Sequence, residues 1–158
     1  MFENIYNKVK NSICSPRDKA LLYVIIFCGP KAKELQSLKP ENLSADENSI
    51  TINFPNRSII IEDSGARFAI SNWAHFVNKK SFGCPIFTST RKNGTLTNKP
   101  LSAVYMNKIL REVFPGKNIR EFRRDFIDKV LKENNCKKTI KKQIGLGSDA
   151  ALLHYTSN

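Results

Sequence analysis

The fold is decided by one stretch of the sequence, ALLYVIIFC at residues 20–28, which runs directly into GPKAKEL at residues 29–35. The first part is apolar on every side, a pattern that predicts a helix in the centre of a core rather than on its surface. Ser15-Pro16 marks the start of this helix, because serine caps helices and proline fits the first helical position. Gly29-Pro30 ends it, and the apolar spacing predicts a shorter helix over residues 31–38.

Outward from this centre, the sequence predicts a mainly helical domain with one small antiparallel β-hairpin, which is the α+β class. Residues 49–54 alternate apolar and polar side chains, residues 58–61 are rich in isoleucine, and Pro55-Asn56-Arg57 is expected to form the turn between these two strands. Helical spacing recurs over residues 66–79, 101–113, 119–133 and 137–144, with a last apolar turn near residues 150–153. Residues 88–100 are rich in threonine, asparagine and lysine and are predicted to be a polar loop.

The length of 158 residues suits one compact domain, which we place at residues 15–158, with residues 1–14 as an N-terminal extension. The 26 lysines and arginines exceed the 14 acidic residues, so the formal net charge is +12. Such a charge attracts polyanions, and nucleic acid is the most common polyanionic partner of a basic domain. Residues 117–142 hold ten basic residues against four acidic ones, which makes this stretch the candidate contact surface. Charge that serves only solubility is the alternative.

Composition also excludes several classes of protein. The longest apolar run is about half as long as a bilayer span, and Met1-Phe2-Glu3 does not begin a secretory signal. We therefore expect an intracellular protein, in the cytoplasm or at the nucleoid or nucleus, with no membrane partner. The four cysteines are scattered and the two histidines stand far apart, so neither a zinc site nor a disulfide framework is expected. We also predict no cofactor.

Several short motifs, taken in their order and spacing, resemble the catalytic domain of the tyrosine recombinases, also called the phage integrase family. GPKAKEL at residues 29–35 resembles the family's Gly-Leu-Arg-x-x-Glu-Leu box, and REFRRDF at residues 120–126 resembles its His-x-x-Arg box. QIGLGS at residues 143–148 resembles its Leu-Leu-Gly-His-Ser turn, and Tyr155 follows Leu146 by nine residues, where the family places its nucleophile. The predicted hairpin and the helices between these boxes also follow the family's order, so the resemblance covers nearly the whole chain.

The resemblance implies a specific chemistry on duplex DNA. The family's tyrosine attacks a DNA phosphate, which leaves a 3′-phosphotyrosine and frees a 5′ hydroxyl. Two arginines hold the non-bridging oxygens, a lysine in the hairpin protonates the leaving oxygen, and no metal takes part. Guanidinium groups suit this task because each can donate two parallel hydrogen bonds to a phosphate that gains charge in the transition state.

Carried over position by position, the resemblance implies four catalytic residues in this chain. Tyr155 matches the nucleophile and Arg123 matches the second arginine. Lys31 stands where the first arginine belongs, and its compact ammonium cannot form a bidentate clamp. Arg120 replaces the box histidine and keeps a donor without an acceptor for a proton near neutral pH.

Other family positions are changed as well. Leu146 replaces a later histidine and can donate nothing, and the hairpin turn contains no lysine, with Arg57 as its nearest cation. We predict that phosphates along the DNA are contacted by a further set of basic residues: Arg57, Arg124, Lys117, Lys141 and Lys142.

These features predict a DNA-binding protein with a tyrosine recombinase catalytic-domain-like fold that acts in the integration or excision of a mobile element. Residues 1–14 are too short for the separate DNA-clamping domain that the family carries, so a fragment and a lone domain both remain open, as does a homo-oligomer on DNA. A catalytically inactive derivative with an architectural or regulatory role on DNA is one alternative function. A protein-interaction module without a nucleic-acid role is the other, and in that case Arg120 and Arg123 would only pair with nearby carboxylates.

Overall fold

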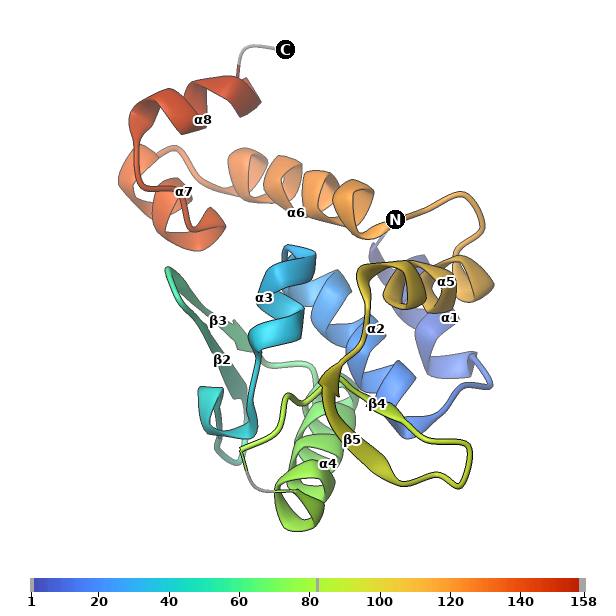
Figure 1. The fold of residues 1–158 in the computed structure, drawn as a ribbon. Helices are drawn as coiled ribbons and strands as arrows, with labels where there is room; N and C mark the ends of the chain where they lie inside the picture. Colours follow the sequence, from blue (N-terminus) through green and yellow to red (C-terminus); the bar gives the residue numbers. More distant parts are fainter. Residues whose placement is uncertain (1, 82, 157–158) are drawn as a thin grey trace.

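The computed structural model describes residues 2–81 and 83–156 and shows a mostly helical molecule with two small antiparallel sheets (Figure 1). The first half of the chain forms α1 (Phe2–Asn11), α2 (Pro16–Cys28), α3 (Ala32–Ser37), a 3₁₀ turn (Pro40–Asn42), β1 (Leu43–Ala45), β2 (Ile50–Phe54), β3 (Arg57–Ile61) and α4 (Ser64–Lys80). The second half forms β4 (Thr88–Thr90), β5 (Leu96–Pro100), α5 (Ala103–Val113), α6 (Ile119–Glu133), α7 (Lys137–Ile144) and α8 (Asp149–Thr156). The predicted fold class is confirmed.

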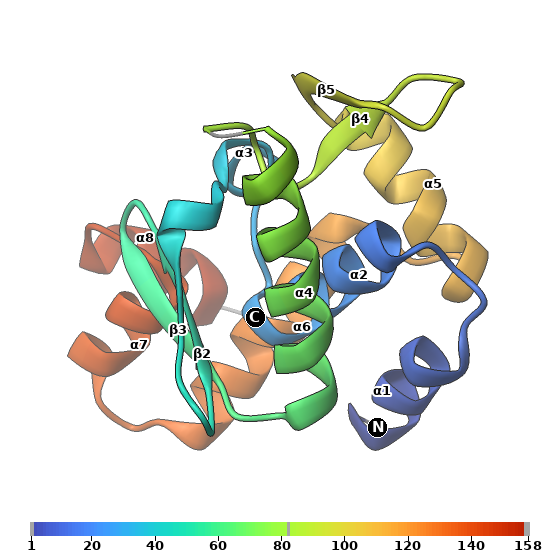
Figure 2. The ribbon, with the colours of Figure 1, turned by 90° about the horizontal axis from the view of Figure 1, so that it is seen from below.

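Helix α2 lies at the centre of the molecule, and α1, α4 and α6 pack around it (Figure 2). The Ser15 hydroxyl caps its start by accepting a hydrogen bond from the Asp18 N–H at 3.2 Å. Every side chain from Ala20 to Ile26 is buried, as expected for a helix without a polar face. Gly29 ends the helix in the left-handed conformation, with φ of 50°. The predicted helix centre and its two end signals are therefore observed.

The predicted hairpin forms β2 and β3 of a three-stranded sheet in the order β1-β2-β3, in which β2 is the central strand. In β2 and β3 the register pairs Ile50 with Ile61 and Phe54 with Arg57, which leaves Pro55 and Asn56 as the turn. Residues two apart share a face of a strand, so Arg57 lies on the same face as the buried Ile61. The first residue of β3 is thus directed into the protein.

Residues 88–100 form a second hairpin, β4–β5, and the prediction of a polar loop is wrong. Thr88 is fully buried, and its hydroxyl donates hydrogen bonds to the carbonyl oxygens of Thr97 and Lys99. Gly94 takes a positive φ of 80° in the turn. Backbone pairing and threonine hydroxyls hold this hairpin, so the apolar alternation that identifies a strand in a sequence is missing.

A small cluster of apolar side chains joins α6, α7 and α8 and is separate from the main core. Its buried members are Ile127, Val130, Ile140, Ile144 and Leu152. Gly145 ends α7 in the left-handed conformation, with φ of 76°. The predicted last apolar turn is in fact a full helix, α8, and Tyr155 from this helix packs against the small cluster.

The predicted N-terminal extension contains helix α1. Its Val9 is fully buried in the main core, and the ring centroid of Tyr6 lies 5.7 Å from that of Tyr23 on α2. In the described part of the chain, no helix is both long and apolar enough to cross a membrane. Within the same residues, no group of three or more His, Cys, Asp and Glu side chains is placed to hold a metal ion.

Candidate functional site

Arg123 lies on α6 and reaches across to the ends of two other helices. Its Nη1 donates a hydrogen bond to the Gly29 carbonyl oxygen at 2.8 Å, and its Nη2 donates one to the Ile144 carbonyl oxygen at 3.2 Å. Helix α6 begins after Asn118, whose side chain caps it by accepting the N–H groups of Arg120 and Glu121. Arg123 therefore lies in the first turns of a capped helix. Arg123 is 8% exposed, so its guanidinium is fixed and almost fully enclosed.

Arg123 also binds the end of α7, whose apolar cluster contains Tyr155 of α8, and the Tyr155 hydroxyl acts on the pKa of the Arg123 guanidinium. Burial lowers the pKa of Arg123, and the nearby positive charge of Arg57 lowers this pKa further. The Glu34 carboxylate and the Tyr155 hydroxyl act in the opposite direction. The structure therefore brings together the two residues whose family positions match best, although 32 residues separate them in the sequence.

Arg57 lies beside Arg123 but faces inward. Its Nη1 donates to the carbonyl oxygens of Cys28 at 2.7 Å and Gln143 at 3.3 Å. Its Nη2 donates to the Gly29 carbonyl at 3.4 Å and to the Glu34 carboxylate at 3.1 Å. Its Nε also donates to Glu34, at 3.4 Å, and none of its side-chain surface is exposed. Arg57 was predicted to contact DNA, but in this structure it offers no free donor to a phosphate.

Glu34 on α3 is the acidic residue of the site. Its carboxylate accepts the backbone N–H of Lys31 at 2.6 Å and binds Arg57, and it lies 4.0 Å from Nη1 of Arg123. One carboxylate therefore faces two buried guanidinium groups. The cluster keeps a net positive charge, which suits an anionic ligand.

The other predicted site residues are more exposed. Arg120 lies one turn before Arg123 on α6, and Lys31 lies just before α3. Neither side chain is joined to Tyr155 by a hydrogen bond in the described part of the chain. The side chains of Arg120, Lys31, Arg124 and Lys142 are exposed.

Lys117 and Lys141 are each engaged in an ion pair. The Lys117 ammonium lies 3.1 Å from Asp125, and the Lys141 ammonium lies 2.7 Å from Asp149. Both pairs are partly solvated, so they hold these lysines only weakly and leave them able to exchange a carboxylate for a phosphate.

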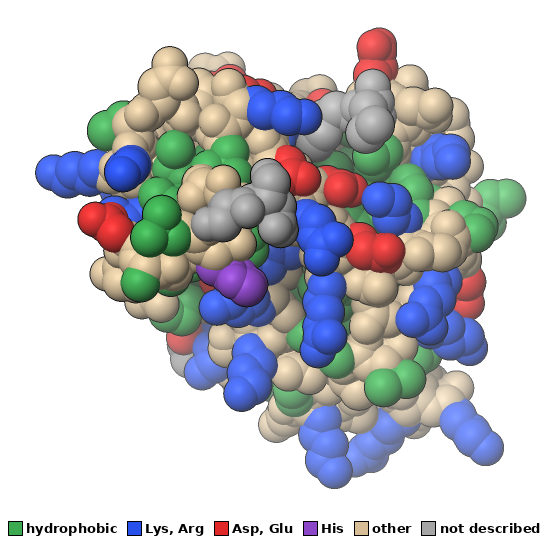
Figure 3. Space-filling view, turned by 90° about the horizontal axis from the view of Figure 1, so that it is seen from above, with side chains coloured by type: hydrophobic (Ala, Val, Ile, Leu, Met, Phe, Trp, Pro, Cys, Tyr) green, Lys and Arg blue, Asp and Glu red, His purple; other side chains and the backbone are tan. Residues whose placement is uncertain are grey.

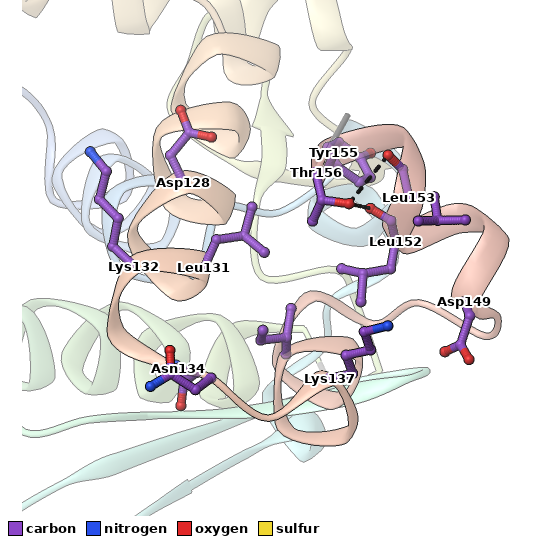
Figure 4. Close-up of a pocket in the computed structure, with 12 residues that line it drawn as sticks. Asp128, Leu131, Lys132, Asn134, Lys137, Asp149, Leu152, Leu153, Tyr155 and Thr156 are labelled. Atoms are coloured by element: carbon purple, nitrogen blue, oxygen red, sulfur yellow. Dashed lines mark hydrogen bonds between the residues drawn. The ribbon is translucent and has the colours of Figure 1, made fainter. Parts of the chain in front are cut away.

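A groove of about 630 Å³ opens between α6, α7 and α8 (Figure 4). Tyr155 lines it together with Leu131 and Leu152. Its charged groups come from two lysines and two aspartates: Lys132, Lys137, Asp128 and Asp149. His154 lies next to Tyr155 with its ring edge-on, at a centroid distance of 5.5 Å. The tyrosine therefore stands between a buried cation and an open, solvated surface.

Seen from above, the molecule carries many lysine and arginine side chains in the lower half of the view, and its acidic side chains lie mostly in the upper half (Figure 3). On this face, the lower half of the view therefore carries a larger excess of positive side chains than the upper half. Such an arrangement fits the electrostatic footprint of a nucleic-acid phosphate backbone.

Comparison with solved structures shows which fold holds this site. The XerH site-specific recombinase bound to its difH substrate matches 98% of this chain and 48% of its own, with a TM-score of 0.75 and 16% identity. The XerA recombinase matches 99% of this chain and 58% of its own, with a TM-score of 0.66 and 16% identity. The Tn1549 transposon integrase in complex with circular intermediate DNA matches 97% of this chain and 57% of its own, with a TM-score of 0.61 and 14% identity.

The chain has the fold of a tyrosine recombinase catalytic domain. It spans about half the length of these solved recombinases. No protein-family model and no curated protein matches the sequence. The predicted likeness to the tyrosine recombinases is confirmed at the level of the fold.

Sequence reasoning missed two features of this recombinase fold. The first is the role of Glu34 as the common partner of two arginines, although the residue was part of the quoted box. The second is the inward direction of Arg57. The alternation of side chains along β3 indicated this inward direction, because Arg57 shares a face of the strand with Ile59 and Ile61. The prediction that Arg57 belongs to the turn implied that its side chain is exposed, but the structure places Arg57 in β3 as a buried residue.

Proposed function

We propose that this chain is a DNA strand-transfer domain that binds duplex DNA, cleaves one strand through Tyr155 and rejoins it. The observation that carries the proposal is the place of Tyr155 in the α6–α7–α8 cluster, to which the buried Arg123 guanidinium is bonded through the Ile144 carbonyl, with the Tyr155 hydroxyl raising the pKa of Arg123. This pair supplies a nucleophile and a cation for one phosphate. The recombinase fold supports the assignment, since two of the solved recombinases of this fold described above are complexes with DNA.

The step is a transesterification. The Tyr155 oxygen attacks the phosphorus, the bond from phosphorus to the 5′ oxygen breaks, and the chain is held as a 3′-phosphotyrosine. The tyrosine proton passes to solvent, and the departing 5′ oxygen takes a proton to become a hydroxyl. Rejoining reverses each change, and the phosphotyrosine bond conserves the energy of the broken linkage.

Arg123 is assigned to the non-bridging oxygens of the phosphate. A guanidinium has five N–H donors, and the Gly29 and Ile144 carbonyls occupy two of those of Arg123. The remaining donors can serve the tyrosine and the phosphate. Because the group is already fixed and nearly desolvated, it needs little reorganisation when charge develops. Arg120 and Lys31 are assigned as exposed cations that attract the same phosphate.

Departure of the 5′ oxygen is the weak step. The turn Pro55-Asn56 carries no lysine, Arg57 is enclosed, and Leu146 cannot donate a proton. The 5′ oxygen therefore leaves with little proton assistance from the positions that supply it in the family, so we expect cleavage to be slow. We extend the proposal to the integration or excision of a mobile element, with more than one copy of the chain acting on the DNA, because a transposon integrase is among the proteins that share the fold.

The test is a nicked suicide duplex, in which cleavage releases a short fragment and traps the phosphotyrosine. Native gels report binding, and denaturing gels report the covalent adduct. We expect a shifted complex and a slowly formed adduct, with the adduct absent in Tyr155→Phe. A shift without any adduct would indicate a DNA-binding protein without cleavage, and the absence of a shift at low salt would exclude DNA as the partner.

A further inference from the structure

We propose that Arg57 is a positioning residue that holds the ends of α2 and α7 so that Arg123 faces Tyr155. The inference rests on the proposed function for the role of Tyr155, but its structural part concerns the protein without DNA. It differs from the sequence prediction, in which Arg57 contacts DNA directly.

The first step is the use of all five donors of Arg57. Five hydrogen bonds link its guanidinium to four residues on three segments: Cys28 and Gly29 at the end of α2, Glu34 on α3, and Gln143 at the end of α7. No N–H group remains for a phosphate. The side chain therefore acts inside the protein, and its effect on DNA must pass through the segments that it joins.

The second step is that Arg123 joins two of the same segments. Arg57 binds the carbonyls of Gly29 and Gln143, and Arg123 binds those of Gly29 and Ile144. The last carbonyl groups of a helix have no partner within it, and the helix dipole makes that end negative. The ends of α2 and α7 thus converge on two guanidinium groups, and each helix end accepts a hydrogen bond from both of them.

Close packing leaves little freedom at this junction. A side chain at Gly29 would bring a Cβ within 2.5 Å of the Cβ of Phe126, and one at Gly145 would lie 3.1 Å from Cδ of Arg57. The Arg57 guanidinium also lies over the rings of Phe54 at 4.6 Å and Phe126 at 5.7 Å. The guanidinium is enclosed by aromatic rings and by backbone, so it cannot shift without moving a helix end.

The third step concerns what α7 carries. Helices α7 and α8 share a small apolar cluster with α6 that is separate from the main core. Apart from α6, this cluster meets the main body where α7 packs on β3, and there the bonds of Arg57 and Arg123 hold Gln143 and Ile144. Tyr155 belongs to the cluster. Releasing Arg57 would therefore loosen the helix that presents the nucleophile while leaving the central helix in place.

Lysine is the conservative replacement that tests this. An ammonium keeps the charge but presents three donors from one nitrogen, so it cannot reach acceptors on three segments at once. We would measure amide hydrogen exchange in the free wild-type protein and in Arg57→Lys. The amide exchange rate over residues 137–156 should rise about tenfold, and that of α2 and α4 should stay unchanged. The substitution weakens only the hydrogen bonds that hold the end of α7. Arg111→Lys, at an exposed position in α5, is the matched control and should exchange like the wild type.

The second measurement separates positioning from DNA contact. Arg57→Gln and Arg123→Gln each remove one charge, and the salt dependence of binding to a duplex is compared. Loss of a phosphate contact lowers the slope of log affinity against log salt by about 0.9. We expect this loss for Arg123→Gln but not for Arg57→Gln, whereas Arg57→Lys should form adduct on the order of a hundredfold more slowly at unchanged affinity.

Each outcome is decisive. Wild-type exchange over residues 137–156 in Arg57→Lys, or an equal loss of slope in both glutamine variants, would overturn the inference. Unfolding of the whole chain in both Arg57 variants would also overturn it, because Arg57 would then support global stability rather than one helix. Absence of DNA binding by the wild type would reject the proposed function and leave the exchange result to decide the structural part.

Discussion

The guanidinium groups of Arg57 and Arg123 share one acceptor, the carbonyl oxygen of Gly29, at 3.4 and 2.8 Å. Two like charges are held this close because the Glu34 carboxylate lies between them and because two helix ends present their carbonyls. Removal of either cation leaves buried oxygen atoms without a donor, which lowers the free energy of unfolding. The pair therefore links the stability of the protein with the geometry proposed for its chemistry.

Neighbouring arginines on α6 should differ sharply in their effect on stability. Arg123→Met leaves the Gly29 and Ile144 carbonyls and the Glu34 carboxylate with fewer partners, and we expect the free energy of unfolding to fall by about 3 kcal/mol. Arg124→Met, at the next and exposed position, should change it little. Urea unfolding followed by circular dichroism measures both. Equal losses in the two variants would contradict the structural role given to Arg123.

Binding to DNA should depend steeply on salt. If several phosphates are neutralised, affinity should drop roughly a thousandfold or more between about 50 and 200 mM salt. Lys142→Gln, at an exposed position of α7, should lower the slope by about 0.9, because one contact is lost. Lys79→Gln on α4 is the matched control and should keep the full slope. A salt-independent affinity would argue against phosphate contacts altogether.

Arg123 should contribute more to DNA binding than Lys138, a lysine of α7. Arg123 is enclosed beside Tyr155, whereas Lys138 is an exposed residue of α7. We expect Arg123→Ala to weaken the complex more than Lys138→Ala when both are titrated at one salt concentration, provided that both proteins are folded by circular dichroism. Identical losses would indicate that diffuse charge, rather than a formed site, binds the DNA.

A substrate with a better leaving group should reveal the missing acid. A bridging 5′-thiolate departs without protonation, so it should restore much of the cleavage rate if proton donation is the main defect. Denaturing gels with normal and 5′-thio duplexes, beside Tyr155→Phe, make the comparison. Adduct that persists in Tyr155→Phe would refute the nucleophile, and no adduct with the thio substrate would favour a protein that only binds.

Alkaline pH should destabilise the protein through a buried thiol. Burial raises the pKa of Cys28 from 9.0 to about 12. Between these values the unfolded chain releases the thiol proton and the folded chain keeps it, so the unfolded state binds fewer protons and stability falls as pH rises. This group alone contributes about 1.4 kcal/mol per pH unit. Cys28→Ala should flatten the fall in chemical unfolding experiments at pH 9 to 12, and an unchanged slope would contradict the assignment.

Local signals in the sequence predicted the elements that depend on local chemistry. Ser15-Pro16 and Gly29 bracket α2, and apolar spacing located α4 through α7. The β4–β5 hairpin was missed because its contacts are made by hydroxyl and backbone groups, whose pairing leaves no hydropathy pattern. Helix α1 was missed because its stabilisation comes from packing of Val9 and Tyr6 on α2 rather than from a strong internal signal.

The candidate site was predictable in part of its membership but not in its contacts. The box spacing selected Arg123 and Tyr155, and the structure bonds Arg123 to the end of α7, next to the cluster that contains Tyr155. The alternation of β3 indicated that Arg57 turns inward, but not which groups it meets, because its acceptors lie on segments far away in the sequence. Those partners become neighbours only when α2, β3 and α7 meet, and no single motif spans all three.

The bonds at this junction connect very distant parts of the chain. Arg57 and Gln143 are 86 residues apart, and Gly29 and Arg123 are 94 residues apart. We expect contacts of such long range to form late in folding, after the local helices and the hairpin. On the ribosome, the hairpin and α2 emerge well before α7 is synthesised. A nascent chain therefore presents Arg57 before the carbonyls of α7 exist, and the site is assembled only as synthesis nears the last helices.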